Sequence, residues 1–245
     1  MSISCLVLYN SDMLTLYPNC TAILFDSGDT LNRPKSGHWF LPPRYRQLLS
    51  AELLMKLDQQ AGTFERAVQH AGQYLDEHHL ILTETAEYAQ FQQFYALLFS
   101  AWGYAIEEEL IDALAEDAVY NDDKFLFFDD VPSVLEQLHG RYQLGIVSDT
   151  WPSLERLFIN ASLRDYFSTF VMSSMHGVWK NEPTLFHIAL QELHIDAEQA
   201  IFIDNSESNL AVAASIGLHP ILIDRYGSVA GKGDFPVIRS LRELE

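Results

Sequence analysis

The feature that most constrains the fold is a series of short apolar runs, each followed by polar residues. The runs are 22–25 (AILF), 144–147 (LGIV), 170–172 (FVM), 201–203 (IFI) and 221–223 (ILI). Continuous apolar runs of this length are typical of strands that are buried on both faces of a parallel sheet. We therefore predict a core that contains five buried strands.

Helical patterns lie between these runs. They cover 131–138, 152–159, 183–193 and 210–216, and a proline stands near the start of three of them. Proline is favoured in the first turn of a helix. Alternation of strands and helices predicts an α/β fold, a Rossmann-like parallel sheet with right-handed crossovers and helices on both faces.

A long stretch without strands interrupts the alternation after the first run. From about residue 42 to residue 120 the apolar residues recur with helical periodicity, and Thr63 is a candidate helix N-cap. We predict an all-helical cap inserted into the core. The predicted parts are a leader of unknown role (1–20), a Rossmann-like core (21–34 and 121–245) and a helical cap (35–120).

The overall charge disfavours two classes of partner. The chain has 15 basic and 34 acidic residues, a formal net charge of −19. This excess of acidic residues opposes nonspecific binding to nucleic acids and to anionic membranes. The chain also has no secretory signature, no apolar run of about 18 residues and only two cysteines, Cys5 and Cys20. We expect a cytoplasmic protein with reduced thiols, and the sequence identifies no protein partner.

Polar residues follow the predicted strands at positions that suit chemistry. In a parallel α/β sheet, ligands bind outside the carboxyl ends of the strands. The candidates there are Asp26, Ser148, Asp149, Lys180, Asp204 and Asn205. They supply a carboxylate nucleophile, a hydroxyl donor, an ammonium group and oxygen ligands for a hard cation. This set predicts phosphoryl transfer through an aspartyl intermediate.

Each candidate has an expected role. Asp26 attacks phosphorus, and Mg²⁺ bridges Asp26 and a phosphate oxygen. Ser148 and Lys180 hold the remaining phosphate oxygens and are also predicted to be catalytic. Asp149 is grouped with this phosphate site, although its position before a helix favours capping of that helix as its main role. Either Asp204 or Asn205 completes the metal site, and the sequence does not separate these two.

Four segments together resemble a known family. They are FDSGDTL, LGIVSDT, GVWKNEPTLFHIAL and IFIDNSESNLAVAASIG, which contain Asp26, Ser148, Lys180 and Asp204 in this order. In order and spacing they resemble the motifs of haloacid dehalogenase-superfamily hydrolases with a helical cap. The resemblance extends from about Thr21 to the end of the chain. It implies a hydrolase that acts on a small phosphorylated metabolite, with Asp26 as the nucleophile.

The chain departs from this family at two positions. Phosphatases of the family usually carry a second aspartate two residues after the nucleophile, as a general acid, whereas this chain has Gly28. Gly28 can still offer its backbone carbonyl to the metal, and Asp29 is expected to brace the turn by bonding backbone amides. Asn205 replaces one acidic residue, which predicts weak Mg²⁺ binding. General acids contribute about 10²–10⁴-fold, so we predict slow turnover that favours aryl or acyl phosphates over sugar phosphates.

Three alternatives to a phosphatase remain open. Cleavage of a carbon–halogen or carbon–phosphorus bond needs no acid at position 28. The latter requires a lysine that forms a Schiff base, and nothing in the sequence marks Lys35, Lys56 or Lys124 as buried. The third alternative is a protein that binds a phosphorylated ligand or a protein without turnover. Trp39 and Phe40 are expected to serve packing rather than substrate contact.

Overall fold

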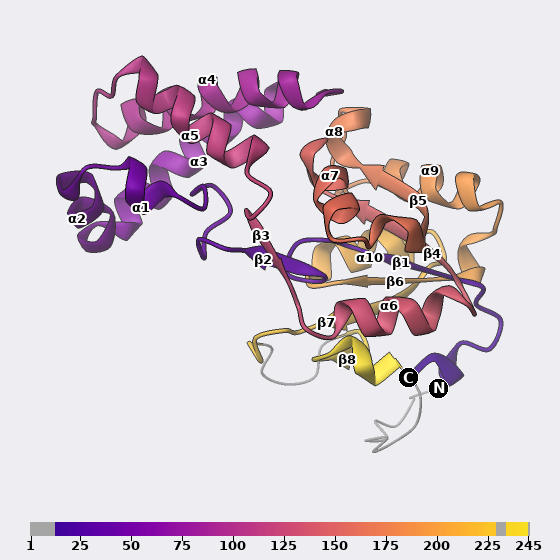
Figure 1. Ribbon diagram of the computed structural model, residues 1–245. Helices are drawn as coiled ribbons and strands as arrows, with labels where there is room; N and C mark the ends of the chain where they lie inside the picture. Colours follow the sequence, from indigo (N-terminus) through magenta and orange to yellow (C-terminus); the bar gives the residue numbers. More distant parts are fainter. Residues whose placement is uncertain (1–12, 229–233, 245) are drawn as a thin grey trace.

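The structure, a computed structural model, describes residues 13–228 and 234–244 and confirms the predicted α/β core (Figure 1). Its main sheet has six strands in the order β5-β4-β1-β6-β7-β8, and all neighbouring strands are parallel. The strands are β1 (Ala22–Phe25), β4 (Gln143–Ser148), β5 (Phe167–Met172), β6 (Ala200–Asp204), β7 (His219–Ile223) and β8 (Val237–Ile238). Each of the five predicted runs lies within one of these strands, and β8 is an addition at the edge.

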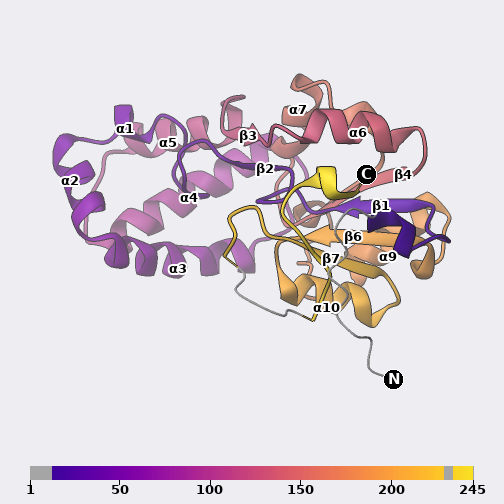
Figure 2. The ribbon, with the colours of Figure 1, turned by 90° about the horizontal axis from the view of Figure 1, so that it is seen from below.

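Helices cover both faces of this sheet, as Figure 2 shows. On one side lie α6 (Val131–His139) and α7 (Ser153–Asn160), and on the other lie α9 (Thr184–Leu193) and α10 (Glu207–Ser215). Successive side chains of a strand point to opposite faces. Accordingly, Ile23 joins the hydrophobic cluster beneath α6 and α7, whereas Leu24 joins the cluster beneath α9 and α10. Burial on both faces explains why the strands are continuously apolar.

The five helices that follow β1 and precede α6 form the cap. They are α1 (Tyr45–Leu48), α2 (Ala51–Gln59), α3 (Ala61–Glu77), α4 (Glu84–Trp102) and α5 (Glu108–Tyr120). They enclose a hydrophobic cluster of their own, to which Phe64 and Leu75 contribute with the predicted periodicity. The prediction for Thr63 was wrong: α3 begins at Ala61, and the Thr63 hydroxyl donates to the carbonyl of Gln60 instead of capping the helix.

A two-stranded antiparallel ribbon joins the cap to the core. It consists of β2 (Asn32–Pro34) and β3 (Phe125–Phe127), which pair across the entire cap segment. The Lys35 amide extends the ribbon by donating to the carbonyl of Lys124 at 2.9 Å. The ribbon therefore brings the beginning and the end of the cap segment to one place, directly after β1.

The remaining elements are short. They are η1 (Met13–Leu16), η2 (Arg164–Tyr166), α8 (Ser173–His176), η3 (Ala197–Gln199) and η4 (Leu241–Leu244). Residues 1–12 of the predicted leader, which include Cys5, lie outside the described residues, while Cys20 is a free, buried thiol. Within the ranges that the structure describes, no helix combines the length and the apolar character needed to span a bilayer.

Candidate active site

Strand order brings the first polar candidates together. β1 lies between β4 and β6, with Phe25 in register with Ile146 and Ile203. Asp26 directly follows β1, Ser148 is the last residue of β4, and Asp204 is the last residue of β6. The carboxyl ends of parallel neighbours meet at one edge of the sheet, so these three side chains converge there.

Lys180 links these groups through its ammonium. Its Nζ donates to Asp26 Oδ1 at 2.5 Å and to Asp204 Oδ2 at 2.7 Å. Ser148 Oγ donates to the same oxygen of Asp26 at 3.0 Å. All four side chains are buried. Both donors hold the same oxygen, Oδ1, and so fix the orientation of the Asp26 carboxylate.

Burial and charge set the protonation of this cluster. Burial raises the pKa of Asp26 to about 7 against the opposing effect of Lys180, and the nearby Asp204 raises it further. Burial alone would lower the pKa of Lys180, but the carboxylates of Asp204, Asp26 and Asp149 outweigh it, so that this pKa is raised. Lys180 therefore stays charged, and three carboxyl groups surround a single ammonium.

Asp149 and Asn209 support the cluster from outside. Asp149 Oδ1 accepts a hydrogen bond from the backbone amide of Lys180 at 2.9 Å, which fixes the segment that carries the ammonium. Asn209 donates from Nδ2 to Asp204 Oδ2 at 3.0 Å. The backbone amide of Ser206 donates to the other oxygen, Asp204 Oδ1, at 2.7 Å. The expectation that Asp149 caps the following helix was wrong: α7 has Pro152 at its N-cap, and the Asp149 carboxylate holds the amide of Lys180 instead.

Asp29 contacts side chains rather than the backbone amides that we expected. Its Oδ1 accepts from the Tyr226 hydroxyl at 2.7 Å, and its Oδ2 accepts from Trp39 Nε1 at 3.2 Å. Its backbone has a φ of 54°, a left-handed conformation that Asp and Asn tolerate better than most residues. The expectation that Asp29 bonds backbone amides was wrong: its carboxylate joins residues from three separate segments.

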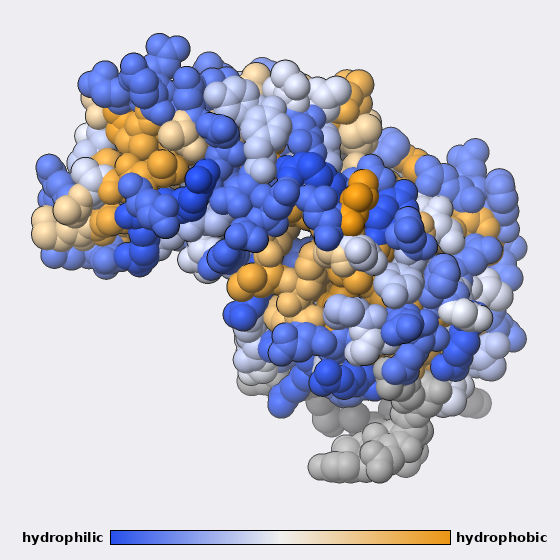
Figure 3. Space-filling model, viewed as in Figure 1, coloured by the Kyte–Doolittle hydropathy of each residue, from blue (hydrophilic) through white to orange (hydrophobic). Residues whose placement is uncertain are grey.

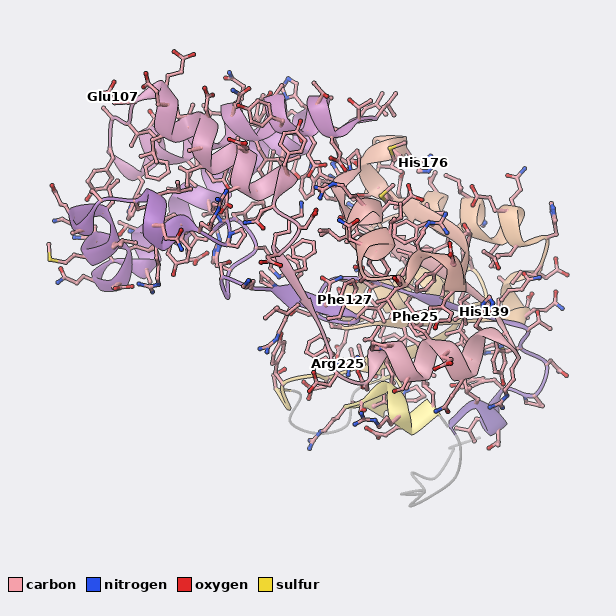
Figure 4. The ribbon with its side chains drawn as sticks, viewed as in Figure 1. Phe25, Glu107, Phe127, His139, His176 and Arg225 are labelled. Carbon is pink, nitrogen blue, oxygen red and sulfur yellow. The ribbon has the colours of Figure 1, made fainter. Side chains whose placement is uncertain are left out.

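Arg225 stabilises the turn that contains Asp29. It donates from Nη2 to the carbonyl of Thr30 at 2.7 Å and from Nη1 to Asp130 at 2.6 Å. Figure 4 shows Arg225 beside the start of α6, close to the end of the ribbon that is marked by Phe127. These bonds fix the turn that follows Asp26 and the segment that carries Tyr226.

A cavity of about 380 Å³ opens between the cap and this cluster. Asp26, Ser148, Asp149, Lys180, Asp204 and Asn205 all contribute to its wall. The rest of the wall is rich in aromatic side chains, including Trp39 and Phe40 as well as Trp151 and Trp179. In Figure 3, hydrophobic residues also gather on the core beneath the cap, over β2 and β3. Trp39 and Phe40 thus pack as expected, against Phe125 and Phe94, and in addition they face the cavity.

A second buried polar cluster, which we did not predict, lies in the same wall. Lys124 Nζ donates to Ser153 Oγ at 2.6 Å and to the carbonyl of Ala118 at 2.8 Å. Ser153 in turn donates from its hydroxyl and its amide to Glu87, at 2.5 and 2.9 Å. Nothing in the sequence marks Lys124 as buried, yet in the structure this residue is only 9% exposed. The cluster joins α4 of the cap to the start of α7 in the core.

We expect Glu87→Gln to destabilise the protein by about 1–3 kcal/mol. Glutamine keeps one acceptor for Ser153 but leaves the buried ammonium of Lys124, 3.7 Å away, without its countercharge. Urea denaturation of wild type and variant measures the difference. Glu65→Gln is the control, because Glu65 is an exposed cap carboxylate. A loss no larger than that of the control would show that the cluster adds nothing to the attachment of the cap.

The loop between α3 and α4 also docks onto the core. The amide of Ile81 donates to the carbonyl of Ser174 at 2.8 Å. His79 stacks on Trp179 with ring centroids 3.4 Å apart, and its Nε2 lies 2.9 Å from Ser173 Oγ. Burial lowers the pKa of His79 to about 4, so the ring is neutral and serves as a packing group. The cap is thus attached immediately beside Lys180.

The oxygen atoms around Asp26 suit a hard cation such as Mg²⁺. Within 13–228 and 234–244, no three His, Cys, Asp or Glu side chains cluster as a ready-made metal site. However, the Asp26 carboxylate, the Gly28 residue and the Asn205 amide border one cavity and offer the oxygen atoms that Mg²⁺ prefers. The excess of carboxyl groups over ammonium groups also favours a cation. The donor set therefore fits a hard cation bound by few protein ligands.

Comparison with known proteins gives the same result as the motifs. The profile of haloacid dehalogenase-like hydrolases matches residues 20–217. Glyceraldehyde 3-phosphate phosphatase of Pyrococcus abyssi is 30% identical over 118 residues, 44% of this chain and 48% of that enzyme. Acyl-CoA dehydrogenase family member 10 of Mus musculus is 44% identical over 62 residues, 25% of this chain and 6% of that protein. The chain thus matches about half of the former and a small part of the latter.

Solved structures agree on the fold. A 2-haloacid dehalogenase from Pseudomonas syringae pv. Tomato DC3000 superposes with a TM-score of 0.60 and 22% identity. The superposition covers 92% of this chain and 96% of that one. The profile match includes β1, the cap and every motif residue named above. The chain belongs to the haloacid dehalogenase-like hydrolases.

Proposed function

We propose that this hydrolase is a Mg²⁺-dependent phosphatase that acts on a small phosphorylated metabolite through an aspartyl-phosphate intermediate. The observation that carries the proposal is the Asp26 carboxylate, buried at the wall of the cavity between cap and core, with one oxygen held by Ser148 and Lys180. A carboxylate held in this way is oriented for nucleophilic attack. The related Pyrococcus enzyme is named for phosphatase activity, which supports the same reaction class.

The chain's own residues supply the nucleophile and the charge stabilisation of the first half-reaction. The second oxygen of Asp26 forms a bond to phosphorus, and the leaving oxygen departs with the electron pair of the broken P–O bond. Lys180 and Ser148 stabilise the negative charge on the phosphoryl oxygens. Water then attacks the phosphorus atom of the aspartyl phosphate, and the bond between phosphorus and the Asp26 oxygen breaks. Its electron pair restores the Asp26 carboxylate, and the protons of the water leave with the phosphate. The cap limits the access of bulk water during the first step.

We assign the metal to Asp26, the backbone carbonyl of Gly28 and Asn205. Asp204 is the weaker candidate, because its two carboxylate oxygens accept hydrogen bonds from Ser206, Lys180 and Asn209. When bound, Mg²⁺ supplies positive charge to phosphate oxygens that would otherwise face several carboxyl groups.

Leaving-group protonation has no donor at the usual position. Gly28 has no side chain, and the carboxylate of Asp29 accepts hydrogen bonds from Trp39 and Tyr226. We therefore keep the prediction of slow turnover and of a preference for leaving groups that need no proton.

The test is phosphate release from p-nitrophenyl phosphate and acetyl phosphate, with added Mg²⁺ and with EDTA. We expect Mg²⁺-dependent turnover of at least one of these two substrates. Turnover of glycerol phosphate should be far slower. Absence of turnover on all three substrates, with Mg²⁺ present, would contradict the proposal. A ligand that raises the melting temperature without any turnover would then support the non-catalytic alternative.

Carbon–halogen cleavage is the second candidate, and the cavity wall favours it. Aromatic walls and a carboxylate nucleophile without a partner acid suit displacement of halide from a small carbon skeleton. Chloride release from 2-chloropropionate that is unaffected by EDTA would establish it in place of the phosphatase. No observation favours carbon–phosphorus cleavage, since the buried Lys124 amine donates to Ser153 and to the carbonyl of Ala118.

The raised pKa of Asp26 predicts a pH dependence. Burial raises this pKa to about 7, and only the ionised carboxylate can attack. We therefore expect kcat/KM to rise as pH increases through about 7 and to level off above it. Because phosphate monoesters themselves ionise near pH 6, the profile should be measured with two esters of different acidity. A midpoint that follows the ester instead of staying fixed would contradict the assignment to Asp26.

A further inference from the structure

Trp39 occupies the space beside Gly28. A Cβ atom added at Gly28 would lie 3.0 Å from Cη2 and 3.1 Å from Cζ2 of the Trp39 indole. Few Cβ atoms in proteins have contacts this short, so a side chain at position 28 would require the ring to shift, and the ring rests against the backbone of residue 28. Gly28 is two residues from Asp26, and both line the cavity with Trp39. The indole therefore stands where a side chain at position 28 would otherwise face the substrate.

The indole is held in this position from two sides. Trp39 Nε1 donates to Asp29 at 3.2 Å, and Asp29 is itself bound by the Tyr226 hydroxyl. The ring of Phe125 meets the indole edge-on, with centroids 5.4 Å apart and an interplanar angle of 69°. A side chain fixed by a hydrogen bond and an aromatic contact loses little conformational entropy when a ligand packs against it.

On one side the indole continues into an apolar part of the cavity wall. Trp39 remains 41% exposed, so part of its surface is available to a ligand. Phe40, Leu41, Pro42 and Pro43 continue the wall from Trp39. The two lysines in the wall, Lys180 and Lys124, are committed to carboxylates, hydroxyl or carbonyl groups. This part of the wall thus offers apolar contact rather than partners for a second charged group.

We propose that Trp39 is the specificity-determining residue of the leaving-group pocket and that it selects flat, apolar leaving groups, so that the substrates are aryl phosphates rather than acyl or sugar phosphates. This inference rests on the proposed function and resolves a choice that the sequence leaves open. An aryl ring packs against the indole, and its oxygen departs as a phenolate that needs no proton from position 28. Gly28 thus provides no general acid, and Trp39 favours a leaving group that does not need one.

The test is binding of two non-hydrolysable ligands, phenylphosphonate and methylphosphonate, measured by calorimetry with Mg²⁺ present. We expect the wild type to bind the phenyl compound about 10-fold more tightly, the size of one good aromatic contact. Trp39→Ala should abolish this preference, whereas Trp39→Phe should retain most of it. Tyr120→Ala is the matched control, because Tyr120 is also 41% exposed but does not line the cavity.

A further variant tests the position of the ring without removing it. Gly28→Ala should displace the indole through the 3.0 Å contact and weaken binding of phenylphosphonate more than binding of methylphosphonate. Equal binding of the two ligands by the wild type, binding of neither, or an unchanged preference in Trp39→Ala would each overturn the inference.

Turnover assays separate this result from the proposed function. Turnover of acetyl phosphate without any phenyl preference would leave the phosphatase standing and refute the role of Trp39. A phenyl preference that depends on Trp39, without turnover of phenyl phosphate or acetyl phosphate, would refute the phosphatase and leave the pocket assignment standing.

Discussion

Asp26→Asn is expected to reduce kcat for p-nitrophenyl phosphate by at least about 10⁴-fold, as removal of a nucleophile does in other covalent enzymes. The amide cannot form the aspartyl intermediate. Asparagine nevertheless has nearly the same shape, and its carbonyl oxygen can still accept the hydrogen bonds from Ser148 and Lys180 that Oδ1 accepts in the wild type. The variant should therefore fold and still bind phosphonates. Its kcat should fall, whereas its KM should change little.

Two controls make this result decisive. Asp123→Asn removes an exposed carboxylate outside the cavity and should leave turnover unchanged. Asp26→Ala guards against slow deamidation of the asparagine, which would restore the nucleophile. If Asp26→Asn and Asp26→Ala both retained more than about a hundredth of wild-type kcat, the intermediate would have to form elsewhere, and the aspartyl mechanism would be wrong.

The core was predictable from the sequence because burial on both faces leaves a local signal. Each central strand is a continuous apolar run, and its helical neighbours show the complementary periodicity. The β2–β3 ribbon gave no such signal. Its strands are three residues long and pair across the whole cap segment, so neither a hairpin turn nor a long run marks them. The edge strand β8 is only two residues long and was missed for the same reason.

The candidate site divides in the same way. Asp26, Ser148 and Asp204 follow or end predicted strands, so the topology of a parallel sheet is enough to bring them together. The hydrogen bond between Asp29 and Tyr226 joins two loop residues that are 197 positions apart. Loops have no periodic sequence pattern from which such a contact could be predicted. Contacts of this kind depend on tertiary packing and have no counterpart in local sequence patterns.

The buried cluster of Glu87, Ser153 and Lys124 was missed on similar grounds. Each residue is ordinary in its own segment: a glutamate in the first turn of a helix, a serine at a helix start and a lysine before a short strand. Only the docking of the cap on the core places them together and buries them. Sequence patterns therefore identify the edge of the sheet that carries the candidate site, whereas the part of the site that the cap builds requires the structure.

Lys180→Met is expected to have the largest effect on stability, because it removes the ammonium between Asp26 and Asp204. Breaking a buried ion pair by removing one partner typically costs about 3–5 kcal/mol. Burial already raises the pKa of Asp26, and loss of the opposing lysine would raise it further. A carboxyl group whose pKa is higher in the folded than in the unfolded state stabilises the folded protein at pH values below its unfolded-state pKa. That stabilisation is lost as the pH rises through its folded-state pKa.

The stability loss of Lys180→Met should therefore depend on pH with a definite sign. Below about pH 7 the Asp26 carboxyl group is protonated in both folded proteins, so the difference in stability between variant and wild type should stay constant there. As pH increases above 7 the variant should fall further behind wild type, by up to about 1.4 kcal/mol per pH unit for the Asp26 carboxyl group. Urea denaturation at several pH values measures this, with Lys35→Met as the control for an exposed lysine in a surface ion pair, where less than about 1 kcal/mol is expected. A loss of unfolding free energy that is small, or that shrinks as pH increases, would mean that the Lys180 ammonium does not hold the two carboxylates together. Another cation would then have to balance their charge.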